Sequence, residues 1–236
     1  MLLNGHEVVY FGHSAFLIKS AKGCSILIDP WISNPANKKR LEEFTRDVQF
    51  ILVTHAHGDH LGDTLEIARS FNSEVIAIYE ITNYLGSRGI SKLTGMNIGG
   101  TVHRSGVSFT MVEATHSSTI SDGERVLPGG NPCGFIITLE DNFRIYHMGD
   151  TGLIGSLEHI AKIYKPNLLL IPIGGHYTMG PEEAAYTIEV LNPDIVVPMH
   201  YKTFPVIDVN VNDLLDKLPM NLRERVKVLQ PGEVLR

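Results

Sequence analysis

Residues 54–60 read Thr-His-Ala-His-Gly-Asp-His and directly follow a strand-like apolar run over residues 48–53. Imidazole and carboxylate groups at this density are the ligand types that suit zinc, manganese or iron. His55 and His57 are two residues apart, so in an extended chain both project to the same side. The stretch therefore predicts a metal site at the end of a strand.

The same stretch also predicts where a helix begins. Gly58 permits a sharp turn of the backbone. From Leu61 onward, apolar residues recur at helical spacing, which predicts a helix that starts near Asp59 and His60. One pair of metal-type side chains is then expected at a strand end, and the other pair at a helix start facing the same space.

The composition indicates a globular protein with no broad nucleic-acid surface. The chain has 236 residues, 43% of them hydrophobic, and a net charge of −6. We expect a single domain over residues 1–236, with Cys24 and Cys133 as buried reduced thiols. No apolar run approaches the ~20 residues of a membrane span, and residues 1–18 lack a signal-peptide pattern. A cytoplasmic protein with no membrane association is the expectation.

The chain alternates strand-like and helix-like segments, which is typical of α/β proteins. A meander of strands is expected first, and strand–helix alternation follows. Residues 121–132 contain several glycines and prolines without periodicity, which predicts a long functional or mobile loop. The expected strands are 8–11, 15–18, 25–28, 48–53, 74–79, 101–104, 107–112, 134–139, 143–146, 168–173 and 195–198, and the expected helices are 63–72, 80–88, 156–164 and 181–191.

Three further metal-type residues also follow predicted strands. His116 comes after strand 107–112, Asp150 after strand 143–146, and His200 after strand 195–198. In open α/β sheets, sites gather at the carboxyl ends of the strands. We therefore expect these side chains to share one cleft with those of residues 54–60.

This order of motifs resembles the metallo-β-lactamase superfamily. Within it, the chain is similar to a family of uncharacterised metal-dependent hydrolases related to the ascorbate-phosphate lactonase branch. The resemblance implies an α/β fold, a four-layer αββα sandwich with a two-metal site at one edge. It rests on the His-x-His-x-Asp-His motif, the later His, Gly-Asp-Thr and His, and residues 12–15, 28–31, 114–118, 146–152 and 172–175.

The resemblance also implies a role for each metal-type residue. One metal ion is expected on three histidines, the second on an aspartate and two histidines, and a further aspartate is expected to bridge them. The implied ligands are His55, His57 and His116 for the first ion, Asp59, His60 and His200 for the second, and Asp150 as the bridge.

The chemistry of such a site favours hydrolysis. Metal ions lower the pKa of bound water to about 7, which gives a hydroxide nucleophile that Asp59 and Asp150 can orient. The ions leave the pocket positively charged, so a small anionic substrate is expected. His176 follows a buried strand through a Gly-Gly turn, and we predict that it is either the leaving-group acid or a substrate contact.

Three other residues are candidates to support the ligands from behind. Asp29 either holds a ligand histidine and backbone amides or caps the turn before a proline. His13 lies either at the pocket edge or in a plain turn. His147 is expected to alternate away from Asp150 and to support it rather than bind metal.

The expected function is a dinuclear metal-dependent hydrolase of a small ester, lactone or phosphodiester. The alternatives are a nuclease or phosphodiesterase that acts on nucleic acid, incidental β-lactam hydrolysis, and a non-catalytic metal-binding protein. The net charge of −6 disfavours nucleic acid as a partner. The sequence leaves the substrate, the metal and the choice between monomer and homo-oligomer open, and it predicts that residues 121–132 and 201–209 shape the pocket.

Overall fold

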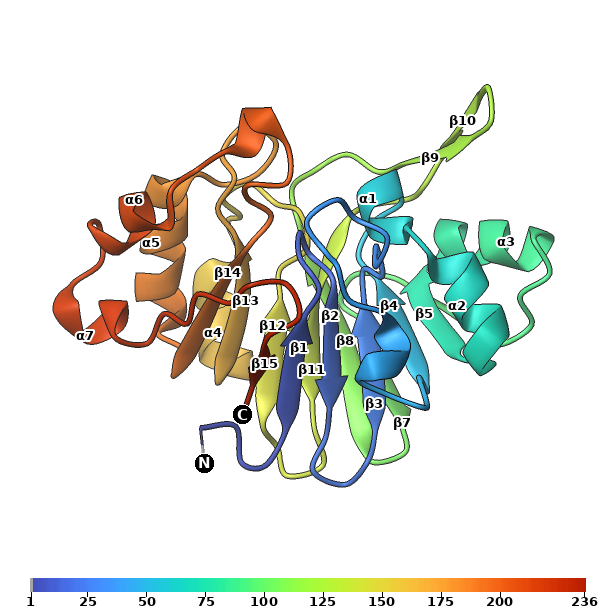
Figure 1. Ribbon diagram of the computed structural model, residues 1–236, viewed down its shortest axis with the longest axis horizontal. Helices are drawn as coiled ribbons and strands as arrows, with labels where there is room; N and C mark the ends of the chain where they lie inside the picture. The colour runs from blue at the N-terminus through green and yellow to red at the C-terminus, as the bar shows by residue number, and fades with distance from the viewer. Residues whose placement is uncertain (1) are drawn as a thin grey trace.

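The computed structural model describes residues 2–236 and contains two β-sheets that pack face to face, with helices on their outer sides (Figure 1). Helices α2 and α3 cover one sheet, and α4 and α5 cover the other. This arrangement confirms the predicted four-layer αββα architecture of the α/β class. Whether residues 1–236 form one folding unit stays a prediction.

The first sheet begins as an antiparallel meander and continues with parallel strands. Its order is β15-β1-β2-β3-β4-β5-β6, with antiparallel pairing from β15 to β3 and parallel pairing from β3 to β6. The expected meander of hairpins is therefore confirmed. The strands are β1 (Glu7–Tyr10), β2 (Phe16–Lys19), β3 (Ser25–Ile28), β4 (Phe50–Val53), β5 (Glu74–Ile78), β6 (Leu93–Met96) and β15 (Val234–Leu235).

The second sheet has the order β14-β13-β12-β11-β8-β7. Strands β12, β13 and β14 are parallel, while β7, β8, β11 and β12 pair antiparallel in turn. The ends of β8, β12, β13 and β14 therefore lie at one edge of the sheet. The strands are β7 (Thr101–Arg104), β8 (Val107–Glu113), β11 (Cys133–Thr138), β12 (Arg144–His147), β13 (Leu168–Pro172) and β14 (Ile195–Met199).

Helices flank both sheets, and two single-turn 3₁₀ segments lie in the connections. The prediction of α5 is confirmed at both ends, and Pro181 occupies its first turn, where the missing N–H costs nothing. The elements are α1 (Gly58–Leu61), α2 (Thr64–Phe71), α3 (Tyr79–Ser87), α4 (Leu157–Tyr164), α5 (Pro181–Leu191), α6 (Val211–Leu215), α7 (Met220–Arg223), η1 (Leu41–Glu43) and η2 (Pro205–Ile207).

Alternation along each strand divides the core into layers. In β11, Phe135 and Ile137 belong to the core shared with the first sheet, while Ile136 between them packs with the α4 and α5 side chains. Phe50 of β4 and Phe109 of β8 meet across the two sheets at a ring-centroid distance of 5.3 Å. The period of two along a strand thus buries both faces of the second sheet.

The prediction of a long loop over residues 121–132 is wrong in part. A β-hairpin of β9 (Thr119–Asp122) and β10 (Arg125–Pro128) occupies much of it and extends away from the sheets (Figure 1). Gly123, at a φ of 63°, lies in the turn between the strands. The strands are largely exposed, so no apolar alternation marked them in the sequence.

One predicted helix is interrupted in the structure. The helix expected from residue 59 onward is broken at Gly62, where a φ of 40° separates α1 from α2. Cys24 and Cys133 are both buried and free, as expected, and burial raises the pKa of Cys24 to about 12. Among residues 2–236, no helix combines the length and the apolar character needed to cross a bilayer.

Candidate metal centre

The predicted metal-type residues meet where strand ends of the two sheets face each other. His55 and His57 follow β4 of the first sheet, and Asp59 and His60 lie on α1 directly after it. The second sheet supplies one residue from each of three strand ends. These are His116 after β8, Asp150 after β12 and His200 after β14.

Three histidines form one potential ligand group. His55, His57 and His116 each offer a ring nitrogen, and these nitrogens lie within 4.8 Å of one another. His55 Nε2 is 3.0 Å from His57 Nδ1, so the two rings present different nitrogens to the same point. Neutral imidazoles at this spacing could hold a divalent transition-metal ion.

Asp150 lies between this group and the remaining histidines. Its Oδ2 atom is 2.9 Å from His200 Nε2, 3.5 Å from His116 Nε2 and 4.0 Å from His55 Nε2. Its Oδ1 atom is 3.3 Å from His60 Nε2. The two oxygens of one carboxylate therefore face ring nitrogens of both predicted ligand sets.

Buried polar atoms at the centre of the site lack hydrogen-bond partners. His60 Nε2 and Asp150 Oδ1 are both inaccessible to solvent and make no hydrogen bond. Such groups are costly unless something satisfies them. A cation between the histidine nitrogen and the carboxylate oxygen would satisfy both, so the residues present fit a metal ion.

The electrostatics of the site favour neutral rings in the first ligand group, an ionised Asp150 and a positive charge at His60. Burial lowers the pKa of His55, His57 and His116, which keeps their nitrogens free to bind metal. Burial alone would raise the pKa of Asp150, but His60 and His200 hold it well below its usual value. Conversely, Asp150 and Asp29 outweigh burial and raise the pKa of His60, so both carboxylates favour a positive charge at that position.

Asp29 supports His60 from behind. His60 Nδ1 donates to Asp29 Oδ2 at 2.8 Å, which turns Nε2 of the same ring toward Asp150. The Asp29 carboxylate also accepts from Thr54, whose backbone N–H donates at 2.8 Å and whose hydroxyl donates at 2.7 Å. Of the two roles left open by the sequence, the contacts favour holding a ligand histidine.

His13 is buried next to the second ligand group. Its Nε2 is 3.1 Å from Asp59 Oδ2, and its Nδ1 is 2.9 Å from Thr203 Oγ1. Burial lowers the pKa of His13 to about 4, so the ring is neutral. Nε2 therefore donates to Asp59, while Nδ1 accepts from the Thr203 hydroxyl. With Asp59, His60 and His200, His13 also forms a group that could hold a metal ion.

His147 is buried and touches the backbone rather than the ligands. Its Nε2 donates to Ser14 O at 3.0 Å, and the Gly149 N–H donates to its Nδ1 at 3.1 Å. These bonds fix the turn that leads to Asp150. Gly149 is required there, because it has a φ of 63° and a Cβ would lie 2.6 Å from Cys133 O.

Left-handed backbone conformations concentrate at this site. His13, Asp29 and His200 have φ values of 55°, 44° and 54°, which are uncommon for residues with a side chain. Such strain persists where the surrounding structure enforces it, often at functional sites. The His200 N–H donates to His13 O at 2.8 Å and ties two of these residues together.

A cavity of about 690 Å³ opens onto the ligand groups. His57, Asp59, His116, Asp150 and His200 line one side of it. The remaining lining residues are not among the predicted ligands or supporting residues. They are Trp31, Ser117, Tyr177, Phe204 and Val206.

Only one of the two segments predicted to shape the pocket contributes lining residues. Phe204 and Val206 lie in the segment over residues 201–209, as expected. No residue of 121–132 is among the described residues that line the cavity. That segment instead packs beneath the ligand turn, where a Cβ on Gly129 would lie 2.4 Å from the Ala56 Cβ.

His176 lies on the surface beside the cavity. It is exposed, its ring packs edge-on against Tyr177 at a centroid distance of 4.6 Å, and it is not among the cavity-lining residues. Tyr177 is the residue of this turn that lines the cavity. The predicted role of His176 as leaving-group acid stays a prediction.

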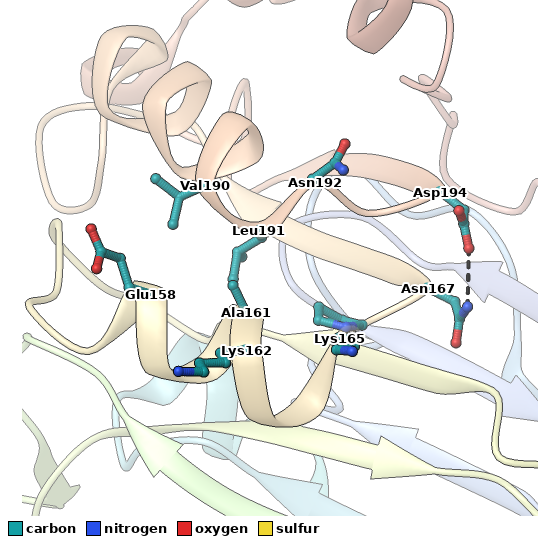
Figure 2. Close-up of a pocket in the computed structure, with 10 residues that line it drawn as sticks. Glu158, Ala161, Lys162, Lys165, Asn167, Val190, Leu191, Asn192 and Asp194 are labelled. Carbon is teal, nitrogen blue, oxygen red and sulfur yellow. Dashed lines mark hydrogen bonds between the residues drawn. The ribbon is translucent and has the colours of Figure 1, made fainter.

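A second hollow, of about 540 Å³, lies between α4 and the end of α5 (Figure 2). Asn167 and Asp194, joined by a 3.0 Å hydrogen bond, line it just before β13 and β14 begin. It is therefore at the opposite edge of the sheet from the histidines. Within residues 2–236, none of its lining residues belongs to a group that could hold a metal ion.

Comparisons with known proteins agree with this geometry. The family described as "Beta-lactamase superfamily domain" matches residues 7–200. The chain is 45% identical over 232 residues to a UPF0173 metal-dependent hydrolase of Methanobrevibacter smithii, covering 96% of this chain and 95% of the relative. It is 46% identical over 210 residues to one of Methanocaldococcus jannaschii, covering 89% and 91%.

A solved structure is similar over nearly the whole chain. It is Igni18, described as a novel metallo hydrolase from the hyperthermophilic archaeon Ignicoccus hospitalis. The TM-score is 0.86 at 39% sequence identity, and the match covers 98% of this chain and 97% of the other. The similarity thus extends through both sheets and every strand end that carries a predicted ligand.

Proposed function

The chain belongs to the metallo-β-lactamase superfamily as a metal-dependent hydrolase, and on this premise we propose that it binds two divalent ions and hydrolyses a small ester, lactone or phosphodiester. The observation that carries the proposal is the position of Asp150. One of its oxygens lies 3.5 Å from His116 and 2.9 Å from His200, and the other lies 3.3 Å from His60. A carboxylate so placed suits a bridge between two ions.

The proposed ligand sets are those that the family resemblance implies. His55, His57 and His116 would hold the first ion, Asp59, His60 and His200 would hold the second, and Asp150 would be shared. Grouping of their nitrogen and oxygen atoms within 4.8 Å of one another supports both sets, and the second group also includes His13. Zinc and manganese both accept such nitrogen and oxygen donors, and iron is a further candidate.

A bound divalent ion would supply a hydroxide nucleophile near neutral pH and would polarise the scissile carbonyl or phosphoryl oxygen. Asp59 lines the cavity, and contacts with His13 and His60 keep its pKa low despite burial. It is therefore an ionised acceptor that can orient the attacking water. His13 fixes the carboxylate, because Nε2–H donates to Asp59 Oδ2. His176 is exposed and packs on Tyr177, which favours a substrate contact, and the leaving-group acid is the alternative role.

A small substrate is favoured over nucleic acid. The net charge is −6, and among the described residues that line the cavity there is no lysine or arginine. Binding of nucleic acid depends on such cations along the phosphate backbone. Retention of the metal-loaded protein on single-stranded DNA at moderate salt would instead support the nuclease alternative.

Metal counting and activity together test the proposal. The protein is stripped with a chelator, reloaded separately with zinc, manganese or iron, and analysed for bound metal. We expect two equivalents, together with turnover of at least one of three substrate types, namely p-nitrophenyl esters, lactones and phosphodiesters. Turnover should disappear in the stripped protein and return on reloading.

Two results would contradict the proposal in different ways. One equivalent or less after reloading would remove the dinuclear site. Two equivalents with no turnover across the panel would favour a non-catalytic metal-binding protein.

A further inference from the structure

Next to the second ligand group, aromatic side chains form a continuous wall of the cavity. Trp31 and Phe204 stack with a centroid distance of 5.8 Å and an interplanar angle of 26°. The His13 ring meets Trp31 at 5.3 Å and Phe204 at 5.6 Å, both edge to face. Its Nε2 donates to Asp59, so one buried histidine joins the aromatic pair to the metal centre.

The wall is fixed in place by backbone contacts. Trp31 N–H donates to Asp29 O at 2.7 Å, and Asn34 Nδ2 donates to Trp31 O at 2.6 Å. The turn after α1 packs directly against it, because a Cβ on Gly62 would lie 2.8 Å from the Trp31 Cα. The tryptophan is therefore tied on one side to the residue that supports His60 and on the other to the helix that carries the ligands.

Among the described lining residues, acidic and imidazole side chains occur only at the predicted metal ligands. Apart from the histidine and aspartate ligands, Ser117 is the one described lining residue that is neither aromatic nor aliphatic. Among the described lining residues there is no lysine or arginine to pair with a negative group away from the ligands. A charged group placed against this wall would lose hydration without gaining a partner.

From these observations we propose that the substrate carries an uncharged, flat apolar acyl group that packs on Trp31 and Phe204 while its carbonyl lies at the metal centre. The inference rests on the proposed hydrolase function and narrows its substrate to aryl or similar carboxylic esters. In the reaction, water oxygen bonds to the carbonyl carbon and the bond from that carbon to the leaving oxygen breaks. The products are an aryl carboxylic acid and an alcohol, whose oxygen takes the proton.

Trp31 is the single tryptophan of the chain, so its fluorescence reports occupancy of the wall without any turnover. The zinc-loaded protein is titrated with benzoate and, in parallel, with acetate, which has the same carboxylate but no ring. We expect a saturable change in emission with benzoate, and affinity about tenfold higher than for acetate, which corresponds to about 1.4 kcal/mol and is within the range of an aromatic contact.

Variants at Phe204 separate ring packing from general damage. Phe204→Ala and Phe204→Leu should each weaken benzoate about tenfold and leave acetate binding and metal content unchanged. Tyr186→Ala removes an exposed aromatic ring from α5, outside the cavity lining, and should change neither. Equal affinity for benzoate and acetate, or equal loss of both in Phe204→Leu, would overturn the inference.

A kinetic arm keeps this inference distinct from the proposed function. The kcat/KM for p-nitrophenyl benzoate and p-nitrophenyl acetate is compared after correction for their rates in buffer. We expect the benzoate ester to be preferred, and Phe204→Leu to remove that preference through KM. Hydrolysis without an acyl preference would contradict only the proposed substrate role of the aromatic wall. Selective benzoate binding without hydrolysis would contradict only the proposed hydrolase function. Preference for a nucleotide p-nitrophenyl phosphodiester over both esters would also overturn the inference.

Discussion

The two walls of the cavity differ in how they are built. The metal-ligand wall stands on strand ends, and its members His55, His60 and Asp150 are almost completely buried. The aromatic wall stands on connecting segments, and its members Trp31 and Phe204 are only partly buried. Hydrogen bonds from neighbouring side chains hold the metal-ligand wall in place. The aromatic wall is positioned chiefly through the backbone of Trp31.

The difference separates two tasks. Side chains that hold metal ions at fixed distances need support from buried, hydrogen-bonded neighbours. Residues that select a substrate can lie on loops, which change without disturbing the scaffold. We therefore expect changes in the first wall to remove metal and reaction together, and changes in the second to alter substrate preference with metal retained.

The largest effect is expected from Asp150→Ala. This change removes the carboxylate that lies between both ligand groups and leaves His60 and His200 facing each other. We expect less than one equivalent of metal after reloading and a loss of kcat of about a thousandfold or more, because the nucleophile depends on the ions. Metal analysis and the same ester assay check it. Two equivalents of bound metal in this variant would show that metal binding does not depend on Asp150, which would contradict the proposed difference between the two walls.

A smaller effect is expected from Asp29→Asn. The amide cannot supply the negative charge that favours a cation at His60, although it retains the shape. Loss of such a supporting carboxylate typically weakens metal binding by about 10–100-fold. Competition with a zinc-sensitive dye measures the affinity. Asp194→Asn, on the hollow at the opposite edge of the sheet, is the control and should leave metal affinity unchanged.

Gly62→Ala should affect both walls, because Gly62 ends the helix that carries Asp59 and His60 and packs against Trp31. The added Cβ would lie 2.8 Å from both Pro30 O and the Trp31 Cα, and the φ of 40° is unfavourable for alanine. We expect a free energy of unfolding lower by about 1–3 kcal/mol and a shifted Trp31 emission. Urea denaturation and fluorescence measure both.

Gly99→Ala is the matched control for this change. Gly99 also has a positive φ, of 90°, but no neighbouring atom lies within 4 Å of its Cβ position. It should therefore carry the backbone penalty alone, without the shift in tryptophan emission. Equal effects in the two variants would show that Trp31 is not held by the turn after α1.

The smallest effect is expected from His176→Ala. The side chain is exposed and contacts Tyr177, so its removal should loosen the aromatic wall and change KM a few-fold. A general acid contributes about 10²–10⁴-fold to the rate. A hundredfold loss of kcat, with loss of the descending limb of the pH–rate profile, would assign the leaving-group proton to His176. Tyr177→Phe, measured alongside, shows whether the tyrosine hydroxyl has that role.

Much of the scaffold was predictable from local pattern. The strands predicted over residues 25–28 and 101–104 match β3 and β7 at both ends, and Pro181 marked the start of α5. The hairpin over residues 119–128 was missed, because its strands are short and largely exposed and carry no sustained alternation of apolar and polar residues. Local patterns record burial, so an exposed hairpin leaves no such signal.

By itself, the sequence determined which residues have metal-type chemistry and that each follows a strand, as with His116, Asp150 and His200. It could do so because both properties are local. Only the tertiary structure decided that Trp31 stacks on Phe204 beside His13. That contact joins a connection after β3 of the first sheet to one after β14 of the second, and no local period relates them. The motif thus fixes the chemistry, whereas the packing of two sheets fixes what the chemistry faces.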